Sequence, residues 1–187
     1  MMSDVKVSER PLSAAAPSEA HLRPGSGEPR RGVQGGEYLT FRISEEEYAL
    51  DILNVQEIRG YEKPTHIANA PPFIKGVLNL RGVIVPIVDL RMQFGLERVA
   101  YDAITVTVVL NVAGRTVGAV VDSVSDVIEL TSNQIKPAPE FNGAVNASHI
   151  TGIGTLKRGD QQRMLILVDI EELLSGVEMG LVERTLN

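Results

Sequence analysis

Hydrophobic and polar residues alternate along this chain from about residue 37 onward, and the alternation predicts short β-strands. Leu39, Phe41 and Ile43 are separated by polar residues, which is the two-residue period of a half-buried strand. After a polar turn the period resumes at residues 48–52, and further strands are predicted at residues 55–59, 76–81 and 83–88. We therefore expect a hairpin followed by further strands, with Pro86 placing its own strand at an edge or a bulge.

The second half of the chain repeats this plan. β-branched segments span residues 104–112, 115–121, 124–130, 150–156 and 164–168. Between the third and fourth of them, residues 131–148 are expected to form a long polar loop. The apolar positions near the C-terminus have helical spacing and predict one face of a helix, at Ile170, Leu173, Leu174 and Val177.

The two halves also match each other position by position. When the sequence is shifted by 69 positions, apolar residues coincide, as Phe41 does with Leu110 and Tyr48 with Val117. At a larger offset, the segment 87–90 coincides with 167–170. A period near 70 residues is too long for a solenoid and suits a duplicated small β unit. Two related units offer two related surfaces, which favours an adaptor over an enzyme.

Each unit has about five short strands, which is the size of a small barrel, and would bury little surface alone. We therefore predict an all-β protein in which two five-stranded barrels pack together, the first at about 37–96 and the second at about 97–170. Residues 1–36 are rich in Pro, Gly, Ser, Ala and Arg, and are predicted to be a disordered tail. Residues 171–187 are predicted to form a C-terminal helix and tail.

Composition narrows the function classes. The net charge of −6 and the content of only four Phe and four Tyr argue against nucleic-acid binding. The lack of cysteine excludes disulfides, thiolate catalysis and cysteine zinc sites. The chain has no apolar run of about 18 residues, and its charged N-terminus does not resemble a signal peptide. We expect a cytoplasmic protein without direct membrane insertion.

Two carboxylates, Asp89 and Asp169, occupy equivalent places at the ends of strands. They could form an acid–base pair, or each could cap the helical turn that follows. We favour capping, because duplicated positions reflect shared structure and no positioned nucleophile accompanies them. His21, His66 and His149 do not have metal-binding spacing, and we predict neither a metal nor a cofactor.

Arg81 lies at a hairpin corner between two apolar strands. A surface arginine at a tight turn is commonplace, but Glu57 lies on another strand segment of the same unit. We hypothesise that Arg81 and Glu57 pair across the unit and present a partly charged patch beside exposed aliphatic side chains. Arginine in such a setting is typical of protein–protein hot spots.

Four segments carry motifs of a known family: EYALDILNVQEIRGYEKPTHIANAPPFIKGVLNLRGVIVPIVDLR, VGAVVDSVSDVIEL, QIKPAPEF and MLILVDIEELL. Together they closely resemble CheW, the coupling protein of bacterial chemotaxis, over about residues 36–174. The resemblance implies two SH3-like five-stranded barrels in a CheW-like domain at 37–174. It also implies a non-catalytic scaffold that joins the cytoplasmic tip of methyl-accepting chemoreceptors to the regulatory domain of the histidine kinase CheA, in arrays at the membrane.

The resemblance further implies where these partners bind. The DILNVQEI stretch resembles the surface that meets the kinase, with Ile52 and Val55 as apolar anchors. The NLRG stretch resembles the corner beside a groove for the helical receptor tip. The residues implied in receptor binding are Glu57, Asn79, Arg81, Gly82, Val106 and Val108. The second unit is expected to offer a weaker contact that closes a ring.

Several alternatives compete with this interpretation. A CheV-like adaptor would need a receiver domain after the second unit, and a CheW-like domain of a larger kinase would need flanking kinase segments. A small ligand-binding or hydrolytic β-barrel would need a cleft with converging polar groups. A nucleic-acid-binding barrel would need a basic, aromatic face.

Overall fold

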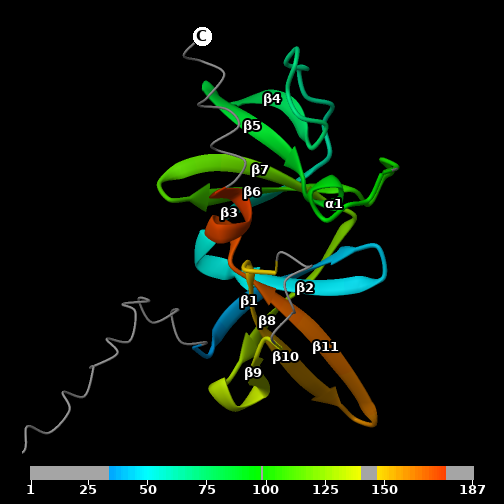
Figure 1. Cartoon of the computed structure of the whole chain (residues 1–187), viewed down its shortest axis with the longest axis vertical. Coiled ribbons are helices and arrows are strands. Elements are labelled where there is room, and N and C mark those ends of the chain that lie inside the picture. The colour runs from blue at the N-terminus through cyan, green and yellow to red at the C-terminus, as the bar shows by residue number, and fades with distance from the viewer. Residues whose placement is uncertain (1–33, 98, 140–146, 176–187) are drawn as a thin grey trace, which may run out of the picture. The chain divides into compact units, whose positions relative to one another are not determined.

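A computed structural model describes residues 34–97, 99–139 and 147–175 (Figure 1). Short strands joined by tight turns make up most of this part of the chain. The strands are β1 (Gly36–Ile43), β2 (Glu46–Asp51), β3 (Val55–Gly60), β4 (Ile74–Leu80), β5 (Val83–Asp89), β6 (Val106–Val112), β7 (Arg115–Val121), β8 (Ser123–Leu130), β9 (Ile135–Pro137), β10 (Ile150–Arg158) and β11 (Gln161–Val168). The helical turns are η1 (Ile52–Asn54), α1 (Leu90–Gln93) and η2 (Ser132–Gln134).

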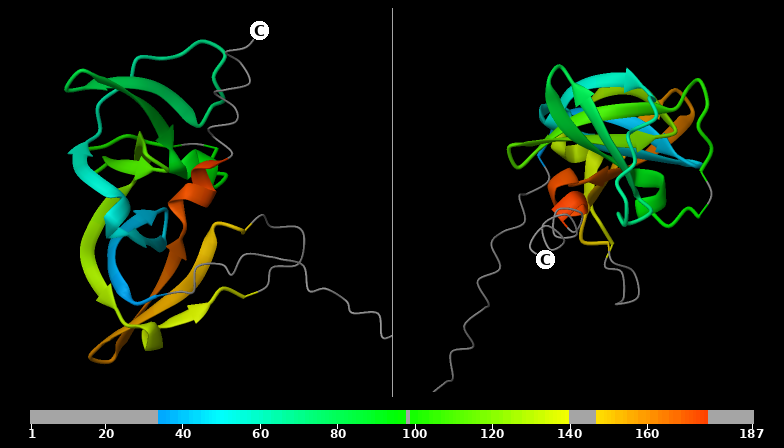
Figure 2. Two further views of the ribbon diagram at one scale, coloured as in Figure 1. Left: turned by 90° about the vertical axis from the view of Figure 1, so that its left-hand side faces the viewer. Right: turned by 90° about the horizontal axis from the view of Figure 1, so that it is seen from above.

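The strands form two sheets, in agreement with the predicted pair of SH3-like barrels. One sheet has the order β8-β1-β2-β11-β10-β9, and the other has the order β3-β6-β7-β5-β4. We call them barrel two and barrel one, because they contain the last strands of the second and of the first repeat. Figures 1 and 2 show barrel one, with β4 and β5, at one end of the ordered body and barrel two, with β10 and β11, at the other.

The two repeats exchange their first hairpins. The β1–β2 hairpin of the first repeat pairs with β8 and β11 of the second. The β6–β7 hairpin of the second repeat pairs with β3 and β5 of the first. The boundary expected near residue 97 therefore does not separate the two barrels, because each barrel contains strands from both sides of it. Alternation of residues predicts strands, whereas the choice of partner strand is set by contacts far apart in sequence.

The exchange is symmetric, which supports the predicted duplication. β5 runs parallel to β7 with Ile87 opposite Gly118. β11 runs parallel to β2 with Leu167 opposite Ala49, and these are the repeat-equivalent positions. All other strand pairs in the two sheets are antiparallel. The same chain path is thus used twice.

The largest apolar core is shared by both barrels. It contains Phe41 and Leu50 from barrel two together with Val108 and Leu110 from barrel one. Ile170, Leu173 and Leu174 join it from the helix that begins at residue 170, as their spacing predicted. Each barrel also has a smaller core of its own. Because one continuous core spans both barrels, burial of apolar surface holds them together.

Two details differ from the sequence-based expectation. The loop expected at 131–148 contains η2 and β9, and β9 pairs with β10. Pro86 lies on an inner strand rather than an edge, but the pairing of β5 with β7 begins only at Ile87. The missing N–H of Pro86 therefore costs no bond to β7.

Residues 1–33, Arg98, residues 140–146 and residues 176–187 lie outside the described part of the chain. The predictions of a disordered tail and a C-terminal tail fall on these residues, as does His21. Across the described ranges, no helix is long and apolar enough to cross a membrane.

Candidate partner-binding surfaces

The first candidate surface is the charged corner predicted at Glu57 and Arg81. Arg81 donates from a guanidinium nitrogen to Glu57 Oε2 at 2.7 Å, which confirms the predicted pair. Glu57 lies on β3 and Arg81 lies in the β4–β5 turn, at the two edges of the same sheet. The pair therefore closes barrel one, and it does so with an arginine whose side chain is 81% exposed.

The NLRG motif builds the turn that presents this arginine. Arg81 and Gly82 have φ of 53° and 88°, the left-handed pair that a two-residue hairpin loop needs. Asn79 Oδ1 accepts a hydrogen bond from the Gly82 N–H at 2.8 Å. The β6–β7 turn repeats this geometry, with Asn111 Oδ1 accepting from Gly114 N–H at 3.0 Å. Asn79 and Gly82 are therefore residues that build the turn, whereas the exposed Arg81 side chain makes no contact that the turn itself requires.

A second arginine shares the Glu57 carboxylate. Arg59 contacts Glu57 Oε1 at 3.4 Å and also pairs with Glu62 at 2.9 Å. Partial burial raises the pKa of Glu57, but the hydrogen bonds from Arg81 and Arg59 outweigh it and hold that pKa below its ordinary value. The carboxylate is therefore charged at neutral pH.

The two strands that meet at this corner carry exposed aliphatic side chains, as hypothesised. Ile58 follows Glu57 on β3, and Val83 and Ile84 follow the Arg81 turn on β5; all three are exposed. The sequence analysis did not single out these three residues. Their position directly beside the turn and the edge strand was the available signal, because side chains near a hairpin end extend beyond the core.

The two predicted kinase anchors are only partly accessible. Ile52 and Val55 are half-buried and pack against the shared core. Between them, Leu53 has a side chain that is 86% exposed at the tip of η1. Asp51 caps this turn by accepting from the Leu53 N–H at 2.9 Å. Leu53 is thus the most exposed apolar residue of this segment, and the sequence analysis missed it.

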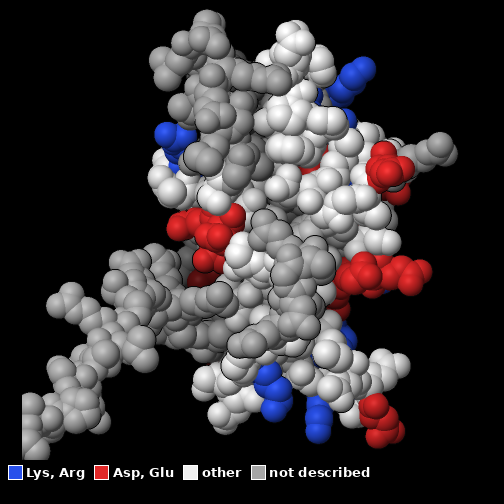
Figure 3. All heavy atoms as spheres, in the orientation of Figure 1, with Lys and Arg blue, Asp and Glu red and all other residues white. Residues whose placement is uncertain are grey.

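A groove of about 610 Å³ lies beside η1. It is lined by residues 34–38, 51–54, 151 and 168–171. Ile52 contributes to it, whereas none of the residues predicted to bind the receptor does. Four carboxylates line it and no lysine or arginine does, at Glu37, Asp51, Asp169 and Glu171. Figure 3 shows acidic side chains gathered at this level, where η1 and the C-terminal helix lie in Figure 1.

The prediction for β6 needs correction. Val108 is only 1% exposed and belongs to the shared core, so its side chain cannot line a surface groove. Val106 is half-buried, and its strand lies next to β3 in barrel one although it belongs to the second repeat. Val108 alternates with Thr107 and shares its face with Leu110 and Val112, so the two-residue period of β6 already placed this valine on the apolar face.

Barrel two has a counterpart of the charged corner. Asp126, the repeat equivalent of Glu57, pairs with Arg163 of β11 at 3.2 Å. Arg163 also pairs with Glu47, and Asp126 accepts from the Thr40 hydroxyl. These hydrogen bonds hold the pKa of Asp126 below its ordinary value. Val127 and Met164 are exposed beside this cluster, at the positions equivalent to Ile58 and Ile84.

The carboxylates at the strand ends act as helix caps, as we favoured. Asp89 Oδ1 accepts from the Arg91 N–H, and Asp169 Oδ1 accepts from the N–H groups of Glu171 and Glu172. His149 stacks at a tilt against Phe94, and burial lowers its pKa. Within the described ranges, no cluster of three or more potential metal ligands occurs.

Comparison with known proteins agrees with this architecture. A family model for the CheW-like domain matches residues 37–178. The chain belongs to the CheW family. Chemotaxis protein CheW of Klebsiella aerogenes is 58% identical over 150 residues, which cover 80% of this chain and 88% of that protein. The Bacillus subtilis chemotaxis protein CheW is 32% identical over 142 residues, covering 75% of this chain and 87% of that protein.

A solved structure gives the same result. The scaffolding protein TtCheW of Thermoanaerobacter tengcongensis matches with a TM-score of 0.66 and 30% identity, over 75% of this chain and 93% of that one. CheW is a family of adaptors, and this member is a coupling adaptor of the chemotaxis system. The comparisons do not support a ligand-binding or hydrolytic barrel.

Proposed function

We propose that this CheW protein joins the regulatory domain of the chemotaxis histidine kinase CheA to the cytoplasmic tip of methyl-accepting chemoreceptors. The observation that carries the proposal is the corner at Arg81, where a charged group on a rigid turn stands among exposed aliphatic side chains. Such a corner has no catalytic geometry, but it has the composition of a binding hot spot. We propose that the protein is non-catalytic and acts in the cytoplasm at receptor arrays.

We assign each of the two partners to its own surface. We assign the kinase to the η1 segment, where Ile52 and Val55 fix the backbone and Leu53 offers an exposed apolar anchor. We assign the receptor to the corner formed by Glu57, Asn79, Arg81 and Gly82, with Val106 on the adjoining strand. Val108 supports this corner from inside the core. A helical receptor tip suits a surface with a few aliphatic contacts and one charge.

The equivalent surface of barrel two supports a further contact of the same type. Val127 and Met164 are exposed and follow Asp126 and Arg163 in sequence, and Ile58 and Ile84 are the exposed residues at the equivalent positions of barrel one. We propose that this surface meets a second kinase or adaptor molecule and closes a ring. In an array, many such contacts act together, so each one can be weak.

Calorimetric titration against the two purified partners tests the assignment. Leu53→Asp should weaken binding of the kinase regulatory domain, and Arg81→Ala should weaken binding of a receptor-tip fragment by at least about tenfold. Lys136→Ala, at an exposed position of β9 in barrel two, is the matched control. If the control and Arg81→Ala bind the receptor fragment equally well, the receptor surface has been assigned wrongly.

A further inference from the structure

The chain passes between the two barrels at two equivalent crossings. The first crossing leads from β2 to β3 through η1, and the second leads from β7 to β8 through Asp122. At each crossing, the linking residues contact the first hairpin of the other repeat. The two crossings therefore have the same position in the fold, and their chemistry can be compared directly.

The first crossing is held by a neutral contact. Asn54 Nδ2 donates to the backbone oxygen of Asn111 at 3.2 Å, and both side chains are near the surface. Such a bond between neutral groups contributes little in the presence of water.

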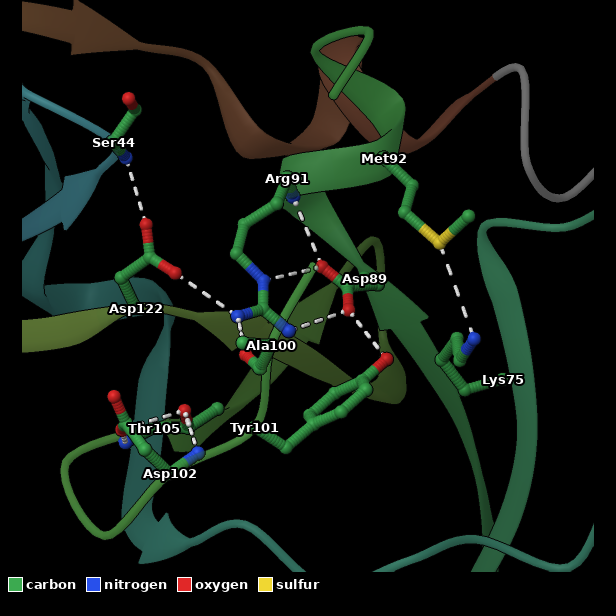
Figure 4. A network of polar contacts seen from close by, with 10 residues as sticks. All are labelled: Ser44, Lys75, Asp89, Arg91, Met92, Ala100, Tyr101, Asp102, Thr105 and Asp122. Atoms are coloured by element: carbon green, nitrogen blue, oxygen red, sulfur yellow. Dashed lines mark hydrogen bonds and ion pairs between the residues drawn. The ribbon is translucent and has the colours of Figure 1, made fainter. Parts of the chain in front are cut away.

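The second crossing is held by a carboxylate with two directed bonds. Asp122 Oδ2 accepts from the Ser44 N–H at 2.7 Å, in the β1–β2 turn of barrel two. Asp122 Oδ1 accepts from a guanidinium nitrogen of Arg91 at 2.9 Å, in α1 at the end of barrel one. The backbone N–H of Asp122 also donates to Arg42 O at 3.1 Å. Figure 4 shows Asp122 standing between Ser44 and Arg91.

The Arg91 guanidinium that pairs with Asp122 is itself held in place by several contacts. Its side chain is 1% exposed, and two of its guanidinium nitrogens donate to Asp89 at 2.9 and 2.8 Å. It also donates to Ala100 O at 2.7 Å and lies over the Tyr101 ring at 4.8 Å. Tyr101 in turn donates to Asp89 Oδ2 at 2.9 Å (Figure 4). All three guanidinium nitrogens donate hydrogen bonds, so Arg91 cannot move away without breaking several of them.

We propose that Asp122 is a positioning residue that sets the orientation of barrel two relative to barrel one. The shared core supplies most of the attraction between the barrels, but apolar contact is not directional. A charge-assisted bond to a rigid arginine and a second bond to the opposite turn are directional and strong. Asp122 is 35% exposed, so water can replace either partner once the bridge is broken.

Nuclear magnetic resonance on the full chain tests this proposal without any partner. Residual dipolar couplings of each barrel are fitted separately, and the two alignment frames are compared. In Asp122→Ala, each barrel should still fit its own structure, while the frames should differ from those of the unchanged protein. The Ser44 amide should exchange with solvent at least about tenfold faster. Asn54→Ala, at the equivalent first crossing, should leave the frames unchanged.

Two results of this experiment would contradict the proposed role of Asp122. One common frame that fits both barrels of Asp122→Ala as well as before would overturn the proposal. An equal shift of the frames in Asn54→Ala would also overturn it, because the effect would then belong to any loosened crossing. If Asp122→Ala does not fold, Asp122→Asn is measured instead. It keeps one acceptor oxygen and should shift the frames by less.

Discussion

Two arginines of barrel one, Arg81 and Arg91, differ in burial, and this difference separates a residue that stabilises the fold from one that we propose contacts a partner. Both lie on the β4–β5–α1 segment, and both pair with a carboxylate at 2.7 to 2.9 Å. Arg91 is 1% exposed and meets two carboxylates, a carbonyl oxygen and an aromatic ring. Arg81 is 81% exposed and meets one carboxylate. An ion pair with a carboxylate therefore does not by itself distinguish the two arginines, whereas the burial of the side chain and the number of its partners do.

The same rule applies across the repeat. Arg163 of barrel two is intermediate, with a side chain 30% exposed and two carboxylate partners. The three arginines form a series in which the loss of stability on substitution should fall as exposure rises, while the loss of partner binding should rise. One substitution, arginine to methionine, can be made at all three sites, because it keeps an unbranched apolar stem and removes the charged guanidinium group.

Arg91→Met should have the largest effect on stability. It leaves Asp89 buried without its cation, and breaking a buried pair from one side costs about 3 to 5 kcal/mol. Burial by itself lowers the pKa of Arg91, but the hydrogen bonds to Asp89 and Asp122 outweigh it and raise that pKa, so the arginine is charged at every pH of interest. Urea unfolding followed by circular dichroism measures the loss. A loss below about 1 kcal/mol would show that water reaches Asp89.

Arg163→Met should cost about 1 kcal/mol, because its pairs are partly exposed to water. The pH dependence sharpens this prediction. Asp126 has a folded-state pKa below its ordinary value of 3.8, so its contribution is complete above that value and is lost as the pH falls through the folded pKa. The difference in unfolding free energy between the unchanged protein and Asp126→Asn should therefore be constant from neutral pH to about pH 5 and disappear in strong acid. A difference that grows on acidification would contradict the sign.

Thr107→Val tests the effect of burial on a polar side chain that lacks a partner, and here substitution should stabilise the protein. The Thr107 hydroxyl is buried in barrel one and, among the described residues, its oxygen has no hydrogen-bond partner. Replacing an unpartnered buried hydroxyl with a methyl group of similar shape should stabilise the protein by about 1 kcal/mol. Thermal unfolding compares Thr107→Val with Thr105→Val. Thr105 accepts from Asp102 N–H and donates to the Asp102 carboxylate, so its loss should destabilise.

Arg81→Met should have the smallest effect on stability, within about 0.5 kcal/mol, since exposed pairs contribute little. Its effect on receptor binding should be larger than that of either other arginine variant. Urea unfolding and calorimetry on the same samples give both numbers. Weaker folding together with unchanged binding would reverse the comparison and assign Arg81 to the fold.

The sequence alone predicted those features that depend on neighbouring residues. Alternation placed the strands, Asp89 and Asp169 were recognised as caps, and the Glu57–Arg81 pair followed from the proximity of two strand segments. The hairpin exchange was not predictable, because the repeat shows which segments are equivalent and not which of them pair. Val108 was misplaced because its position was inferred from the family resemblance, although its alternation with Thr107 put it on the apolar face of β6. The Arg91 cluster was missed although Asp89 is two residues away, because its other partners, Ala100, Tyr101 and Asp122, come from later turns of the chain.

The NLRG motif illustrates how far a motif can be interpreted. Asn111 and Gly114 form the same turn as Asn79 and Gly82, but with Ala113 in the place of Arg81. Two residues of the motif are therefore explained by turn chemistry, and only Arg81 requires a functional account. The spacing of asparagine and glycine identifies the turn, and the residue before the glycine determines which side chain the turn exposes.

The central claim is that one molecule binds kinase and receptor at the same time through separate surfaces. The most direct test is to titrate a receptor-tip fragment into a preformed complex of the full chain with the kinase regulatory domain. Analytical ultracentrifugation follows the size of the complex. If the surfaces are separate, a ternary complex should form with the unchanged protein. Arg81→Met should prevent binding of the receptor fragment while the kinase domain stays bound. Displacement of the kinase by the receptor fragment would show that the two partners share one surface, and would contradict the account.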